Sequence, residues 1–218
     1  MIADKKCKTC RRAGEKLFLR GDRCFTPKCA FERKSYAPGK RDYERKHRST
    51  VTEFGMQLRE KQKIRNIYRV PEKQFARYVK ESVSRSSGSP AELLYAELEL
   101  RLDSAAYRAG FAASRAEARQ IVSHGHILVN GRRVTVPSYR LREGDVLSVR
   151  EGSAEKPIFA RMKESGAGAA ASSEGAVGVP SWILADAKEK TGTIVGIPRR
   201  ETDQGGLSFK SVIEFYSR

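Results

Sequence analysis

The asparagine–glycine pair Asn130-Gly131 constrains the fold of this chain more than any other feature. It lies between two strand-like runs, residues 126–129 (HILV) and 132–136 (RRVTV), which are rich in β-branched residues. A two-residue hairpin turn needs positive φ at both positions, so Asn-Gly between two such runs is the strongest short-range signal of an antiparallel hairpin. A Gly-Asp pair then precedes another strand-like run over residues 146–150. The sequence therefore predicts a small antiparallel sheet.

Two helices are predicted just before this hairpin. Ser89 and Glu92 are spaced as a capping box with proline between them, and they predict a helix that continues to residue 107. Ser114 and Glu117 repeat the spacing and predict a shorter helix through Val122. Packing both helices on the hairpin gives a compact α/β module.

Four cysteines fall within the first 29 residues, as Cys7, Cys10, Cys24 and Cys29. Two short-spaced pairs of thiolates can hold a tetrahedral zinc ion in a closed site, which favours a structural role over catalysis. An iron–sulfur cluster and four free thiols are the alternatives. The intervening segment is predicted to form a small hairpin, with residues 16–20 followed by a turn at Gly21 and Asp22. We expect nearby cations to lower the thiol pKa values; they are Lys5, Lys6, Lys8, Arg11, Arg12, Arg23 and Lys28.

Helical periodicity marks the remainder of the N-terminal part. From Thr52 to Tyr68 apolar residues fall roughly on one side, and Pro71 separates this stretch from a second helix predicted over residues 72–85. Phe75 and Tyr78 belong to the apolar stripe of the second helix. They are therefore interpreted as core residues and not as base-stacking platforms.

Positive charge is concentrated in the N-terminal part. The chain has a formal charge of +17, and residues 1–90 contain 25 Lys and Arg against 10 Asp and Glu. Such an excess points to a polyanionic partner, above all nucleic acid. The residues predicted to contact RNA lie in an arm, on the first helix, and on the helix and hairpin of the module. They are Lys40, Arg41, Arg45, Lys46, Arg48, Arg59, Lys61, Lys63, Arg65, Arg115, Arg119, Arg132 and Arg133.

No apolar run approaches the roughly 20 residues needed to cross a bilayer, and the first residues lack the apolar stretch of a signal peptide. We therefore expect a cytoplasmic protein without a membrane partner. In a reducing compartment, clustered cysteines are metal ligands more often than disulfides.

The stretch FAASRAEARQIVSHGHILVNGRRVTVPSYRLREGDVLSVRE resembles the S4 RNA-binding module. The segments EFGMQLREKQKIRNIYRV, RLDSAAYRAGF and IEFYSR resemble the family of bacterial small ribosomal subunit protein number four. CRRAGEKLFLRGDRCFTPKCAFERKSYAPG is similar to the zinc-bearing form of that family. The resemblance runs through nearly the whole chain in the family's order.

The resemblance implies a structural constituent of the small ribosomal subunit. It further implies binding to small-subunit rRNA at a multi-helix junction during early assembly, and a position beside the channel through which mRNA enters. Number five of the small-subunit proteins would be the main protein neighbour.

The fold class implied is α+β. Residues 1–90 would hold the zinc knuckle, basic arm and helical domain, and residues 91–160 the S4-like module of two helices on a small antiparallel sheet. Residues 161–180 read as a low-complexity linker, and residues 181–218 are expected to pack on the N-terminal domain.

Two segments depart from the family pattern. Residues 165–178 form a Gly, Ala and Ser run in place of a charged helix, and KRDYERKHRS replaces a short Gln-His-Gly element after Gly39. The second segment keeps its basic character, but no single residue in it can be assigned to mRNA.

Two other classes of protein share some of these features. An RNA-modifying enzyme is suggested by the triplet Arg101-Leu102-Asp103, which pseudouridine synthases use around their catalytic aspartate. The triplet here precedes the module, and only 68 residues follow position 150, without His, Cys or a Gly-rich phosphate loop. A zinc-containing transcription factor or heat-shock RNA-binding protein is disfavoured because no His pair follows the cysteines.

Overall fold

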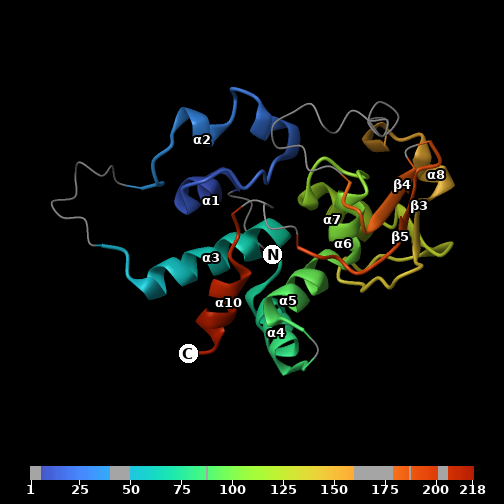
Figure 1. Ribbon diagram of the computed structural model, residues 1–218. Coiled ribbons are helices and arrows are strands. Elements are labelled where there is room, and N and C mark those ends of the chain that lie inside the picture. Colours follow the sequence, from blue (N-terminus) through green and yellow to red (C-terminus); the bar gives the residue numbers. More distant parts are fainter. Residues whose placement is uncertain (1–5, 40–49, 87, 160–178, 187, 201–205) are drawn as a thin grey trace. The chain divides into compact units, whose positions relative to one another are not determined.

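The computed structural model describes residues 6–39, 50–86, 88–159, 179–186, 188–200 and 206–218 (Figure 1). The chain divides into two compact units. The first unit comprises residues 1–95 together with 200–218, and the second comprises residues 96–199. The first unit is therefore discontinuous in sequence, with the second inserted into it.

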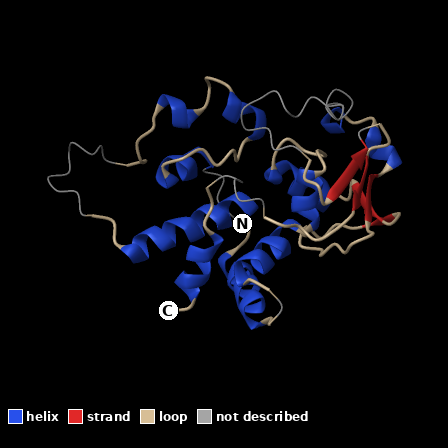
Figure 2. Cartoon of the chain, viewed as in Figure 1, coloured by secondary structure: helices blue, strands red, loops and turns tan. Residues whose placement is uncertain are grey.

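The described part of the first unit is helical (Figure 2). Its elements are α1 (Lys6–Ala13), the 3-10 helix η1 (Gly21–Phe25), α2 (Ala30–Arg33), α3 (Glu53–Tyr68), α4 (Glu72–Ser84) and α10 (Phe209–Tyr216). Helix α5 (Pro90–Glu99) begins in this unit and ends in the second.

Helix α3 begins where the sequence predicts. The Thr52 side chain caps it by accepting a hydrogen bond from the Gly55 N–H, and Arg69 ends it in the left-handed conformation with φ 54°. The C-terminal helix α10 lies along α3 and also contacts α4, although more than 120 residues separate them in sequence (Figure 1). Ring contacts from Phe75 to Tyr216 and from Tyr95 to Phe209 bring the end of the chain into the core of the first unit.

The second unit combines helices with a sheet. It contains α6 (Leu102–Arg108), α7 (Arg115–Ser123), α8 (Glu151–Ala154) and the 3-10 helix η3 (Pro157–Phe159). Its strands are β1 (Ile127–Val129), β2 (Arg132–Arg133), β3 (Val146–Val149), β4 (Ile183–Asp186) and β5 (Thr191–Ile194).

The strands form one antiparallel sheet in the order β2-β1-β3-β5-β4. Asn130 and Gly131, with φ of 50° and 75°, make the predicted turn between β1 and β2. The Asn130 side chain also accepts the Val146 N–H and donates to Asp145, which ties the turn to the start of β3. The predicted hairpin is confirmed, with β2 shorter than expected.

The core of the second unit lies where α6 and α7 meet the sheet. Leu102, Ile121, Ile127 and Leu147 are almost fully buried there, as is Phe159. Two helices on an antiparallel sheet are the arrangement predicted for the module.

The single helix predicted over residues 90–107 is wrong. The chain extends at Arg101, where ψ is 141°, and Arg101 forms an isolated bridge with Arg140. The backbones of Leu100 and Leu102 bond residues 141 and 139 respectively. These partners lie 37 to 41 residues away in sequence, so local capping signals could not indicate the break.

Two further expectations need correction. Residues 181–199 do not join the N-terminal domain, because β5 pairs with β3 and belongs to the second unit; only residues 200–218 complete the first unit. Residues 16–20 form no hairpin, since the next element is the 3-10 helix η1.

Within the described residues, no helix is long and apolar enough to cross a membrane.

Candidate nucleic-acid interface

His126 lies at the junction between α7 and β1, where polar groups from several segments meet. His124 ends α7, and Gly125 turns the chain with φ 71°. The His126 Nδ1 atom is 2.9 Å from the Ser153 Oγ, and its ring meets the rings of His124 and Phe159 edge to face. The imidazole is thus held in place by α8 and η3 as well as by its own strand.

Positive groups surround this imidazole. Burial lowers the pKa of His126 below its usual 6.5, and the charges of Lys156, His124, Arg150 and Arg133 lower it further. We call these five residues the His126 cluster. Because the cluster disfavours a further positive charge, it forms a local electropositive surface suited to phosphate.

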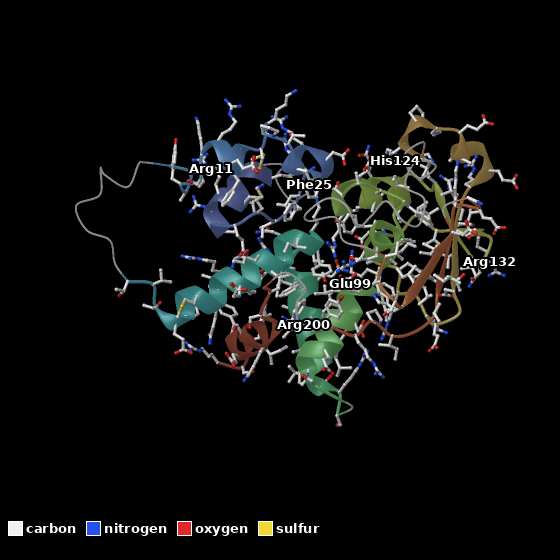
Figure 3. All side chains as sticks on the ribbon, turned by 45° about the horizontal axis from the view of Figure 1, so that its top comes forward. Arg11, Phe25, Glu99, His124, Arg132 and Arg200 are labelled. Carbon is white, nitrogen blue, oxygen red and sulfur yellow. The ribbon has the colours of Figure 1, made fainter. Side chains whose placement is uncertain are left out.

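Arg133 is positioned by its neighbours. Its Nη2 donates to the His124 carbonyl at 3.1 Å, and its guanidinium lies over Gly125, where a Cβ would stand 2.1 Å from Nε. Arg132 and Arg133 are both exposed on β2, one of the two edge strands of the sheet, as the sequence predicts. Figure 3 shows Arg132 there. These two arginines keep their side chains on the surface.

Arg115 and Arg119 do not form the exposed face that the sequence predicts. The Arg115 side chain is 14% exposed, pairs with Glu99 at 3.0 Å and lies 4.7 Å from the centre of the Tyr107 ring. Arg119 pairs with the buried carboxylate of Asp103 at 3.5 Å. Their charges help to neutralise buried carboxylates, a role that periodicity alone does not reveal.

Asp103 is a structural carboxylate. It is 3% exposed and accepts two hydrogen bonds from Arg101, at 3.0 Å from Nε and 2.8 Å from Nη2. A carboxylate buried in a bidentate ion pair is neither accessible nor free to act as a nucleophile. Asp103 is therefore not placed as the catalytic aspartate of a pseudouridine synthase would have to be, although the triplet resembles that motif.

The predicted basic face of α3 is mostly internal to the first unit. Lys61 is buried, binds Glu72 at 2.6 Å and lies over the rings of Phe215 and Tyr216. Arg65 also pairs with Glu72. The prediction of an exposed Lys61 is wrong. Lys61 is covered by the C-terminal helix, and the sequence around Lys61 carries no signal of that distant contact.

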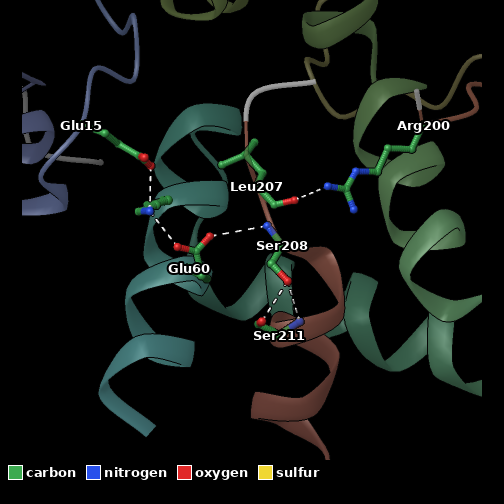
Figure 4. Close-up of polar contacts among 7 residues, drawn as sticks. Glu15, Glu60, Arg200, Leu207, Ser208 and Ser211 are labelled. Atoms are coloured by element: carbon green, nitrogen blue, oxygen red, sulfur yellow. Dashed lines mark hydrogen bonds and ion pairs between the residues drawn. The ribbon is translucent and has the colours of Figure 1, made fainter. Parts of the chain in front are cut away.

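Lys63 links three segments of the first unit. Its ammonium contacts Glu15 at 2.8 Å and Glu60 at 2.7 Å, and Glu60 also accepts the backbone N–H of Ser208 at the start of α10 (Figure 4). The Lys63 side chain is 12% exposed. Of the four cations predicted on α3, only Arg59 is fully on the surface. Lys40, Arg41, Arg45, Lys46 and Arg48 lie outside the described residues.

The four cysteines are close enough for Cys7, Cys24 and Cys29 each to influence the pKa of Cys10. Cys10, Cys24 and Cys29 are buried and Cys7 is partly exposed. Burial raises the pKa of Cys10, a hydrogen bond from the Leu17 backbone lowers it, and the other three thiols raise it. Burial likewise raises the pKa of Cys24, against a hydrogen bond from the Arg20 backbone. The expectation that nearby cations lower these thiol pKa values is wrong for Cys10 and Cys24, because burial dominates.

The described residues include no group of three or more His, Cys, Asp or Glu side chains close enough together to hold a metal ion. The predicted zinc knuckle is therefore not assembled in this structure, although the four cysteines are thiol donors of the kind that zinc binds and backbone groups of Leu17 and Arg20 form hydrogen bonds with Cys10 and Cys24.

Sequence reasoning missed Arg150 and Lys156 of the His126 cluster. Arg150 directly follows β3 and is the last residue of the strand predicted over residues 146–150, so its position at that strand end was an available signal. Lys156 follows the short α8, and nothing in the local pattern distinguishes it from other exposed lysines.

Comparisons with known proteins agree with this arrangement. The family model described as ribosomal protein S4/S9 N-terminal domain matches residues 2–99, and the S4 domain matches residues 100–147. The small ribosomal subunit protein uS4 of Natranaerobius thermophilus is 49% identical over 97% of this chain and 96% of its own length. The uS4 protein of Syntrophomonas wolfei is 44% identical over 99% of this chain and 98% of its own.

A helical unit of this family joined to an S4 domain defines a ribosomal type of protein, and the electropositive His126 cluster lies in and beside that domain. The match extends over almost the full length of both this chain and its relatives. The chain belongs to the uS4 family of small ribosomal subunit proteins.

Proposed function

We propose that this protein is a structural, non-catalytic constituent of the small ribosomal subunit that binds small-subunit rRNA. The observation that carries the proposal is the His126 cluster, in which Lys156, Arg150 and Arg133 act electrostatically on a held imidazole in and beside the S4 domain. Cations of this kind neutralise phosphates, so affinity depends on salt and specificity on the shape of the RNA.

The proposal is tested by titrating the protein against small-subunit rRNA and an unrelated RNA of similar size over a salt series. Arg150→Ala and Lys156→Ala should each weaken rRNA binding and reduce the salt slope by about one. Arg142→Ala is the matched control, because Arg142 is equally exposed but precedes β3 whereas Arg150 follows it. Equal binding to both RNAs would refute the function, and equal effects of all three variants would refute the role of the cluster.

We also propose where in the small subunit this protein lies and when it joins. The family resemblance supports binding at a multi-helix junction early in assembly, a position beside the channel through which mRNA enters, and contact with number five of the small-subunit proteins. Stepwise assembly from purified components provides the test. Omitting this protein should stop later proteins from joining, whereas unimpaired assembly would contradict an early role.

We further propose that Cys7, Cys10, Cys24 and Cys29 hold zinc, with an iron–sulfur cluster as the alternative. The buried thiols and the backbone N–H groups directed at Cys10 and Cys24 support a closed structural site. When bound, zinc would keep the thiols deprotonated and stabilise residues 7–29. Elemental analysis of protein purified without added metal should give one zinc per chain. Iron with visible absorption would establish the cluster, and neither metal would refute both.

A further inference from the structure

Two aromatic rings stack in the N-terminal segment of the first unit. The ring centres of Phe18 and Phe25 are 5.1 Å apart, and their planes differ by 23°. Phe18 has a φ of 48°, in the left-handed region that large side chains rarely adopt. Strain of this kind persists only where the surroundings enforce it, and it gathers at functional positions. Buried Leu17 and buried Gly21 on either side of Phe18 provide that support.

Phe25 leaves much of its ring uncovered. Phe25 is the last residue of η1, and 42% of its surface is exposed. Because Phe18 covers one face of the ring, the accessible part lies on the other face and the ring edge. A planar group placed there would extend an existing stack. Figure 3 shows Phe25 at the surface of the N-terminal segment.

The charge around this ring favours a nucleic acid. Residues 6–39 contain ten Lys and Arg against three Asp and Glu. Arg20, Arg23 and Lys28 are exposed and lie within five residues of Phe25 in sequence. An apolar protein surface would have to desolvate these cations, whereas the phosphates beside an unpaired base would neutralise them.

We propose that Phe25 is a stacking platform for an unpaired base of RNA, with Arg20, Arg23 and Lys28 at the flanking phosphates. The proposal deepens the rRNA-binding function and rests on it. Other aromatic residues of the first unit differ in this respect. Phe75 and Tyr78 are buried, and exposed Phe54 packs against Phe215 on α10.

The first test replaces Phe25 in the full-length protein and measures binding to small-subunit rRNA. Phe25→Leu keeps an apolar side chain but removes the ring face, so affinity should fall by at least about fivefold. Phe25→Trp and Phe25→Tyr should retain affinity. Phe54→Leu is the matched control and should bind as the unaltered protein does, because Phe54 is 49% exposed in the same unit. A loss below about twofold for Phe25→Leu overturns the proposal.

The second test reads the contact directly. Phe25→Trp adds a fluorophore to a chain whose one tryptophan is Trp182, and stacking on a base should quench the added emission. The corresponding Phe54→Trp emission should stay unchanged. Binding without quenching at position 25 refutes stacking. Quenching by RNA-free small-subunit proteins instead of rRNA assigns the ring to a protein contact and also refutes it.

The unpaired state of the base is tested by photocrosslinking from position 25. The crosslinked nucleotide should be one that chemical probing shows to be unpaired, and a crosslink inside a continuous helix contradicts the proposal. If the unaltered protein fails to prefer small-subunit rRNA, the proposed function fails. If the unaltered protein prefers small-subunit rRNA and the Phe25 variants bind it with unchanged affinity, only the proposal of stacking on Phe25 is refuted.

Discussion

Arg115 shares the buried carboxylate of Glu99 with Arg108. Glu99 has no exposed surface, receives two hydrogen bonds of 2.8 Å from Arg108 and a third of 3.0 Å from Arg115, and belongs to a different helix from either arginine. This arrangement ties α5, α6 and α7 together. It makes Arg115 part of the internal support of the S4 domain.

Removing the Glu99 charge should destabilise the second unit strongly. Glu99→Gln removes the charged acceptor of two hydrogen bonds from the buried guanidinium of Arg108, and the free energy of unfolding should fall by about 3 to 5 kcal/mol. Urea unfolding followed by circular dichroism measures this loss. Glu97→Gln is the control, because Glu97 is also buried but its partner Arg140 is 53% exposed, so solvent screens that pair and the loss should be smaller. Equal losses would contradict the importance of the Glu99 pair.

Gly125 and Gly131 both have a left-handed backbone, but only Gly125 lies against Arg133. Replacing each with alanine therefore separates the cost of backbone strain from the effect of displacing Arg133. Gly125→Ala and Gly131→Ala both place a side chain at positive φ, at 71° and 75°, so each should cost about 1 to 2 kcal/mol of stability. Only the Cβ at position 125 meets the Arg133 guanidinium. Since that end of arginine is flexible, it should move away and rRNA affinity should fall. Affinities that change equally in the two variants would show that Arg133 needs no fixed position.

RNA binding should depend on the protonation of His126. Its pKa is lowered in the free protein, so the unfolded state binds the proton more readily, and folding stability should decline as pH falls below about 6.5. Phosphate beside the His126 cluster would raise that pKa, so rRNA should bind more tightly at pH 5.5 than at pH 7.5, with proton uptake. Calorimetry in buffers of different ionisation enthalpy measures the uptake. His126→Gln should abolish the uptake; if it persists, another group is responsible.

The contact between Tyr216 and Glu72 should hold the C-terminal helix. The Tyr216 hydroxyl donates to Glu72 at 2.6 Å, and burial with this hydrogen bond raises the tyrosine pKa. Tyr216→Phe should lower the free energy of unfolding of the first unit by roughly 1.5 to 3 kcal/mol. Limited proteolysis should cut α10 faster in the variant. Phe215→Leu removes a neighbouring ring without touching Glu72, and an equal effect would assign the loss to ring packing alone.

The pKa of Glu72 gives this contact a pH dependence. Burial opposes ionisation, but hydrogen bonds from Lys61 and Tyr216 outweigh it and lower the pKa below 4.5. The stabilisation is therefore complete above about pH 4.5 and is lost as pH falls through the lower folded value. Tyr216→Phe should weaken this acid sensitivity, as thermal unfolding between pH 3 and 6 would show.

Elements fixed by neighbouring residues could be predicted from the sequence. The Asn130-Gly131 hairpin and the helix capped by Ser114 form as expected because their signals are local. Burial of Lys61 by α10 and the helix break at Arg101 depend on partners far along the chain, and no periodic pattern contains them. The same limit explains the site: exposed Arg132 and Arg133 were predicted, whereas Arg150 and Lys156 join His126 through tertiary packing.

The packing of α10 on α3 sets an order for events during synthesis. Residues 96–199 form a unit that is continuous in sequence, and all of it is synthesised after α3 and before α10. The apolar side of α3 therefore has no partner helix until Phe209 and Val212 of α10 have been made, more than 120 residues later. The N-terminal unit is thus the first of the two units to be started and cannot complete its core until α10 is present.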